Sequence, residues 1–125
     1  MLCVCLVEDD ASVRSSIGFA LEVDGHRVDP FASAAAVLAC DRRADWTCLV
    51  IDYHLPDMDG LTLLASLRAQ NIIVPAIFIT SNPTQRLRSQ ITKAGARLVE
   101  KPLLEDALFT TIFTAVGEFA GPAST

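Results

Sequence analysis

Three carboxylate side chains follow two apolar stretches of the sequence. Residues 49–51 read Leu-Val-Ile and lead into Asp52, after which the chain breaks into a loop rich in Pro, Asp and Gly. Glu8 and Asp9 follow the apolar residues 2–7 in the same way. An ionised carboxylate at the end of a buried strand is costly to desolvate unless a cation or a chemical step compensates for it. Because hard cations prefer oxygen ligands, the pattern indicates a divalent metal site.

A hydroxyl group and an ammonium group end two further apolar stretches. Thr80 and Ser81 close residues 74–80, and Lys101 follows residues 98–100. Phosphoryl transfer to a carboxylate needs this combination of groups. A metal ion offsets charge on the phosphoryl oxygens, a cation and a hydroxyl bind further oxygens, and the carboxylate attacks in line. The residue types therefore indicate phosphoryl transfer to an aspartate, provided that the fold brings the strand ends together.

The apolar pattern predicts an α/β domain with a parallel, doubly wound sheet. Strands are expected at residues 2–7, 26–30, 47–52, 74–80 and 98–100, and helices at 13–21, 33–40, 61–71, 83–95 and 104–119. Strands that alternate with helical crossovers pair in parallel, so their carboxyl ends share the edge where ligands bind. The second strand is expected near a sheet edge because Pro30 cannot donate to a ladder. Residues 1–120 are expected to form one domain, and residues 121–125 a frayed tail or the start of a linker.

The composition argues against several classes of protein. Hydrophobic residues make up 51% of the chain, which suits strands covered on both faces. A formal net charge of −5 argues against nucleic-acid binding by this domain. No apolar run reaches the length of a membrane span, and the first residues lack the pattern of a signal peptide. We therefore expect a cytoplasmic protein without membrane contact.

The cysteines do not form a recognisable metal or redox motif. Cys3, Cys5, Cys40 and Cys48 fit none of the CxxC or paired ligand spacings. We expect them to be small buried hydrophobic residues in a reducing compartment, with a reactive thiol as the alternative.

Several motifs at the expected strand ends resemble those of the receiver domain of two-component response regulators. They are Val7-Glu8-Asp9-Asp10, Leu49-Val50-Ile51-Asp52 with Leu55-Pro56-Asp57-Met58-Asp59-Gly60, Ile79-Thr80-Ser81, and Glu100-Lys101-Pro102. The resemblance covers residues 1–120 and implies a flavodoxin-like (βα)5 fold with a five-stranded parallel sheet. It also implies a phosphoprotein of a two-component system or phosphorelay, which takes its phosphoryl group from a histidine kinase or a phosphotransfer protein.

The resemblance also implies a role for each motif residue. Asp52 would accept the phosphoryl group, Mg²⁺ would be held by Glu8, Asp9, Asp52 and the backbone carbonyl of His54, Thr80 would be the switch hydroxyl, and Lys101 would bind the phosphoryl group. The Lys101–Pro102 peptide bond is expected to be cis, which is common only before proline. Without the motifs, Asp9 is equally well a helix cap, Thr80 a hydroxyl bonded to the backbone, and Lys101 a surface charge. Asp10 matches a variable position and is expected to cap a helix or face solvent.

The chain departs from the family in the parts that signal. Leu98 stands where an aromatic residue usually moves with the switch hydroxyl, and Leu103 stands where Phe often follows Lys-Pro. The stretch 95–98 is also one residue shorter than the usual turn into this strand. We therefore expect phosphorylation to switch the face of the fourth helix, fifth strand and fifth helix without an aromatic rotamer change.

The same face is the candidate surface for a homodimer. Phe109 and Phe113 lie one turn apart beside the expected apolar stripe of the last helix. They are either the flank of the core or an exposed patch for a partner. Basic side chains are expected beside them, namely Arg86, Arg88, Lys93 and Arg97.

Two other functions are compatible with parts of the pattern. A degenerate receiver would bind partners without phosphorylation, and Leu98 is the feature that favours it. A phosphatase with an aspartyl nucleophile would carry a second acid two residues after the nucleophile, where this chain has His54. We expect a participant in phosphotransfer rather than a turnover enzyme.

Overall fold

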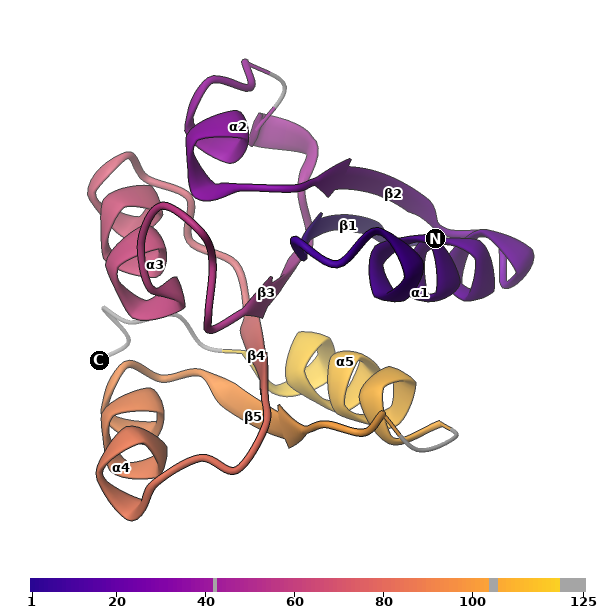
Figure 1. The fold of residues 1–125 in the computed structure, drawn as a ribbon. Coiled ribbons are helices and arrows are strands. Elements are labelled where there is room, and N and C mark those ends of the chain that lie inside the picture. The colour runs from indigo at the N-terminus through magenta and orange to yellow at the C-terminus, as the bar shows by residue number, and fades with distance from the viewer. Residues whose placement is uncertain (42, 104–105, 120–125) are drawn as a thin grey trace.

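The computed structural model describes residues 1–41, 43–103 and 106–119. Strands and helices alternate along the chain (Figure 1). Their bounds are β1 Cys3–Val7, α1 Ala11–Val23, β2 Arg27–Phe31, α2 Ala34–Leu38, β3 Cys48–Asp52, α3 Gly60–Ala69, β4 Ala76–Thr80, α4 Gln85–Lys93, β5 Arg97–Glu100 and α5 Ala107–Glu118. A short 3-10 helix, Arg43–Asp45, lies between α2 and β3.

The strands form one parallel sheet in the order β2-β1-β3-β4-β5. Helices α1 and α5 cover one face, and α2, α3 and α4 cover the other (Figure 1). Alternate side chains of each strand pack toward opposite faces: Val4 and Leu6 contact the α1 and α5 side, and Cys5 and Val7 contact the other. The sequence-based prediction of a doubly wound, flavodoxin-like sheet is therefore confirmed.

Polar N-caps begin four of the helices close to the carboxyl ends of the preceding strands. The side chains that accept the capping hydrogen bonds are Asp10 for α1, Ser33 for α2, Asp59 for α3 and Thr84 for α4. Asp10 has the capping role expected for it. The fourth helix begins later than predicted because Thr84 caps it, so that Pro83 precedes the helix and does not lie in its first turn. The predicted start of the last helix at Leu104 and the predicted tail fall outside the described residues.

The edge strand β2 is tied to the segment before β3 through a buried carboxylate. Asp29 accepts a hydrogen bond from the indole Nε1 of Trp46 at 2.9 Å and pairs with Arg27 at 3.3 Å. The ring of Trp46 meets that of Phe31 edge to face, with centroids 5.8 Å apart. Pro30 lies in this edge strand, as its missing N–H predicts.

Phe109 and Phe113 were each expected either at the flank of the core or in an exposed patch, and the structure distinguishes these alternatives. Phe109 packs into the core on the α1 side and lines a groove between α1 and α5. The ring of Phe113 lies 5.5 Å from that of His26, in the loop that follows α1. The core-flank alternative therefore holds for Phe109, whereas Phe113 is 44% exposed. Both side chains face α1, so neither belongs to a surface formed with α4 and β5. The periodicity placed them at the flank of the stripe but could not say which flank.

The cysteine side chains are part of the core. Cys3, Cys5 and Cys48 are buried, and Cys40 is half-buried. Burial raises the pKa of the Cys5 thiol well above its usual value and that of Cys48 to about 12, so neither forms a thiolate readily.

Among the described residues, no helix has the length and apolar character that crossing a membrane requires.

Candidate functional site

The carboxyl ends of the central strands bring the three predicted acids together. Strand β1 pairs with β3, so Glu8 and Asp9, which follow β1, lie beside Asp52 at the end of β3. One carboxylate oxygen from each of these residues lies within 4.8 Å of the others. We call these residues the acidic cluster. Three converging carboxylates that include two buried ones make a donor set that fits Mg²⁺.

Lys101 reaches the acidic cluster from the end of β5. Its Nζ lies 3.3 Å from Oδ2 of Asp52 and 3.1 Å from Oε1 of Glu8. Burial lowers the pKa of this ammonium group, but the hydrogen bond to Glu8 and the charge of Asp52 outweigh it and raise the pKa above its usual value. Lys101 is therefore a fixed cation beside Asp52. The Lys101–Pro102 peptide bond is cis, as expected.

Glu8 is the most deeply buried acid of the cluster. Its side chain has no exposed surface, and Oε2 accepts a hydrogen bond from the amide of Asp10 at 3.1 Å. Burial and the neighbouring Asp52 carboxylate raise the pKa of Glu8 to about 7, although Lys101 and the Asp10 amide oppose this shift. The site thus holds more negative charge than its single lysine balances. A divalent cation would relieve that excess.

The loop after β3 fixes the orientation of Asp52. Oδ1 of Asp52 accepts a hydrogen bond from the backbone amide of His54 at 3.1 Å, and the residue is only 4% exposed. The loop closes where Gly60 donates to the carbonyl of Tyr53 at 2.8 Å. A Cβ atom at Gly60 would lie 2.7 Å from the ring of Phe78, so only glycine fits this turn. The structure thus places the backbone amide of His54 against Asp52, and the role of the His54 carbonyl as a metal ligand stays a prediction.

Thr80 ends β4 in the strand next to Asp52. It is 1% exposed, and its hydroxyl has no hydrogen-bond partner among the described residues. A buried hydroxyl without a partner is costly, and this one is available to bond to a group that enters the site. The backbone carbonyl of Thr80 accepts from the amide of Lys101 at 2.8 Å, which links the two residues. A pocket of about 410 Å³ opens beside Thr80, between His54 and the start of α4.

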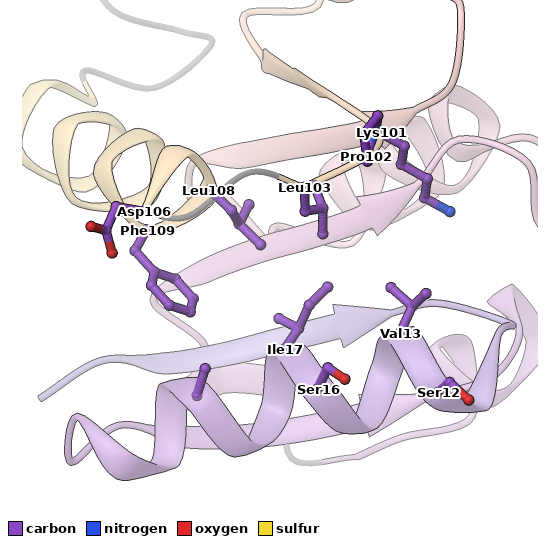
Figure 2. A pocket seen from close by; sticks show the side chains of 11 residues that line it. Ser12, Val13, Ser16, Ile17, Lys101, Pro102, Leu103, Asp106, Leu108 and Phe109 are labelled. Carbon is purple, nitrogen blue, oxygen red and sulfur yellow. The ribbon is translucent and has the colours of Figure 1, made fainter.

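The groove between α1 and α5 lies outside this site. Its volume is about 470 Å³, and Figure 2 shows side chains of both helices facing it. The lining is largely apolar and includes Val13, Ile17, Leu108 and Phe109. Lys101 lines one end of the groove, but no member of the acidic cluster does.

Two residues that support the site were missed at the level of sequence. Arg14 donates from Nη1 to the backbone carbonyl of Glu8 at 2.7 Å. Asp57 accepts from the amides of Ala34 and Ala35 at 3.1 and 2.8 Å, so the loop after β3 holds the start of α2. Arg14 stands four residues after Asp10, the N-cap of α1. This spacing could have suggested that the Arg14 side chain reaches back to the loop before the helix. Nothing in the sequence pairs Asp57 with α2.

Comparisons with known proteins agree with this geometry. The family model described as "Response regulator receiver domain" matches residues 4–113. The transcriptional regulatory protein FixJ of Bradyrhizobium diazoefficiens is 32% identical over 122 residues, which are 97% of this chain and 59% of FixJ. The C4-dicarboxylate transport transcriptional regulatory protein DctR of Rhodobacter capsulatus is 33% identical over 94% of this chain and 61% of its own. The chain thus spans about three fifths of these relatives.

Solved structures show the same fold. The crystal structure of FixJ-N matches with a TM-score of 0.80 and 32% identity, and the match covers 94% of this chain and 95% of that one. The non-phosphorylated receiver domain of HemR from Leptospira biflexa matches with a TM-score of 0.86 over 93% of this chain and 94% of its own. Its identity of 22% means that this second likeness concerns the fold alone.

Proposed function

Because the chain belongs to the family of response regulator receiver domains, we propose that Asp52 is its phosphoacceptor. The observation that carries the proposal is the position of Asp52. Its carboxylate lies in the acidic cluster, and Oδ2 is 3.3 Å from Nζ of Lys101. No other described carboxylate combines membership of the acidic cluster, a contact with Lys101 and a place at the end of β3. The phosphoryl donor would be a histidine kinase or a phosphotransfer protein.

Each site residue would have a separate role in phosphoryl transfer. Glu8, Asp9, Asp52 and the backbone carbonyl of His54 would hold Mg²⁺, which supplies positive charge to the phosphoryl oxygens. An Asp52 oxygen would attack phosphorus in line, so that a P–O bond forms while the P–N bond to the donor histidine breaks. The hydrogen bond from the His54 amide orients the Asp52 carboxylate during this attack. The ammonium group of Lys101 would shift from the carboxylates to a phosphoryl oxygen and bind it.

We propose that Thr80 converts this modification into a structural change. The buried hydroxyl, which lacks a partner among the described residues, would donate to a phosphoryl oxygen and draw the end of β4 inward. The change would then reach the face formed by α4, β5 and α5. Two ion pairs lie there, Arg88 with Glu100 and Arg97 with Glu118. Leu98 would repack without the rotation of an aromatic ring.

The domain would act as a signalling component in the cytoplasm and would not turn over a substrate. Two points support this: the family of the chain, and the assignment of Asp52 as a carboxylate that takes up a phosphoryl group and later loses it. The curated relatives are longer and bear the names of transcriptional regulators, so the receiver would control an output module where one is joined to it.

Mass spectrometry after treatment with acetyl phosphate and Mg²⁺ tests the assignment of Asp52. The wild-type protein is expected to gain one phosphoryl group, and Asp52→Asn is expected to gain none. Asparagine keeps the size and the hydrogen bond to the His54 amide, so the variant should remain folded. Full modification of Asp52→Asn at another residue would overturn the assignment.

A further inference from the structure

We propose that Arg14 is a positioning residue of the metal site, which it holds in shape by binding the backbone of the acidic loop. The inference rests on the proposed function of the acidic cluster. Nη1 of Arg14 donates to the carbonyl oxygen of Glu8 at 2.7 Å and lies 3.4 Å from that of Asp9. One guanidinium nitrogen thus contacts the peptide groups on both sides of Asp9.

Asp9 depends on this contact more than Glu8 does. The backbone amide of Glu8 donates to Phe31 at 3.0 Å, and its carboxylate accepts from the amide of Asp10 at 3.1 Å. Asp9 is exposed, and among the described residues no protein group donates to its carboxylate. The direction of the Asp9 side chain is therefore set by the two peptide groups that Arg14 binds.

The position of Arg14 on α1 restricts the movement of its side chain. Its own amide donates to the carbonyl of the cap residue Asp10 at 2.9 Å, in the first turn of the helix. The side chain then returns to the loop that precedes the cap. A guanidinium group is always charged and loses little freedom per hydrogen bond, because its planar fork is already organised. The helix thus serves as the base from which the loop is held.

A positioning role and a purely electrostatic role predict opposite effects on metal affinity. Arg14 is a cation beside a site for cations, so removing its charge should strengthen Mg²⁺ binding if only Coulomb repulsion mattered. Removing the guanidinium group should weaken Mg²⁺ binding if Arg14 orients the carboxylate ligands. Loss of a residue that orients metal ligands typically lowers affinity by about 10- to 100-fold.

Titration of the unmodified protein with Mg²⁺ by calorimetry distinguishes these effects. Arg14→Met keeps the apolar stem and removes the donor, and we expect its Mg²⁺ affinity to fall by about tenfold or more. Arg14→Lys keeps a charged donor and should recover most of the affinity. Lys93→Met, which removes an exposed cation at the end of α4, is the matched control and should bind Mg²⁺ as the wild type does.

Phosphorylation by acetyl phosphate provides a second measurement. The Mg²⁺ concentration at half-maximal rate should rise in Arg14→Met by the same factor, while the rate at saturating Mg²⁺ stays close to that of the wild type. Arg14→Gln, which suits a half-buried helix position because its side chain is shorter and polar, should give the same result and replaces Arg14→Met if that variant does not fold. Thermal unfolding in EDTA checks that each variant is intact.

The outcomes separate this inference from the assignment of Asp52. Unchanged or increased Mg²⁺ affinity in a folded Arg14→Met or Arg14→Gln protein would overturn the positioning role. Failure of the wild type to be phosphorylated would instead count against the proposed function, and the calorimetric comparison would still stand. An equal loss of affinity in Arg14→Lys would also contradict the inference, because the donor is then not what matters.

Discussion

Glu8 is the residue in which burial and charge conflict most directly. In the folded protein its pKa is raised to about 7, whereas in the unfolded chain it is close to the usual value of about 4.3. A raised acid pKa means that the stability it contributes is present below the unfolded pKa and is lost as pH rises through the folded value. Ionised Glu8 therefore destabilises the metal-free protein at neutral pH.

Replacement of Glu8 by Gln should remove this loss. We expect the free energy of unfolding of Glu8→Gln, relative to wild type, to improve between pH 4.5 and pH 7.5 by on the order of 3 kcal/mol, since one pKa unit corresponds to about 1.4 kcal/mol and most of the shift to about 7 falls in this range. Urea unfolding in EDTA at the two pH values measures the difference. A variant that is destabilised equally at both would show that Lys101 already compensates the charge.

Thr80 is the last residue of β4, four residues before Thr84, which caps α4, so its effect belongs to the scale of elements. Its buried hydroxyl has no partner among the described residues, and Val has the same shape without the hydroxyl. Thr80→Val should therefore raise the free energy of unfolding by about 1 kcal/mol. It should also reduce the beryllofluoride-induced shifts of the α4 amides, because no hydroxyl can then bind the phosphoryl mimic.

Chemical denaturation and NMR spectra of Thr80→Val check these effects separately. Thr84→Val is a suitable comparison, since it removes a hydroxyl that does have a partner, the amide of Leu87 at 3.0 Å. That variant should be less stable than the wild type. Normal α4 shifts in folded Thr80→Val would count against the switch role.

Asp57 joins the loop after β3 to the start of α2. The backbone amides of Ala35 and Ala34 hold the pKa of the Asp57 carboxyl below its usual value. A lowered acid pKa gives stability that is present above the unfolded pKa, near 3.9, and is lost as pH falls through the folded pKa. Asp57→Ala should therefore unfold at a lower temperature at pH 7, and the difference from wild type should shrink in acid.

Hydrogen exchange locates the effect of Asp57→Ala. The amides of Ala34 and Ala35 should exchange faster, whereas that of Ala36, which donates to Ser33, should change less. Faster exchange confined to α3 would show that the side chain serves its own loop and not α2.

At the scale of the whole molecule, helix α5 borders two surfaces: the α1 side, which Phe109 and Phe113 face, and the face formed by α4, β5 and α5. If phosphorylation creates a dimer through α4, β5 and α5, Arg97→Glu should weaken it, because it breaks the ion pair with Glu118 of the same chain and leaves like charges on the surface that would meet its copy. Phe113→Ala should leave it unchanged, since that ring packs beside His26 on the other side of α5. Sedimentation with and without beryllofluoride measures both. Weakening by Phe113→Ala alone would place the interface on the α1 side.

The sequence was sufficient for the sheet and for the acidic cluster. Apolar runs that stop at Asp52, Thr80 and Lys101 define strand ends, and parallel topology then places those ends at one edge. It was not sufficient for Arg14 and Asp57, because both bind backbone groups whose positions depend on loop geometry. The directions of Phe109 and Phe113 also depended on how α5 packs against α1, which helical periodicity does not specify.

The buried Trp46 determines what fluorescence can report about this protein. It is the only tryptophan, and it lies just before β3, whereas Asp52 ends that strand. Five strand residues span roughly 16 Å, so the emission should respond little to a ligand at the carboxyl edge. The indole is held by Asp29 and Phe31 of the edge strand β2. Its emission spectrum therefore reports the separation of β2 from β1 during unfolding. Detection of phosphoryl binding calls for a dye or a fluorine label placed elsewhere.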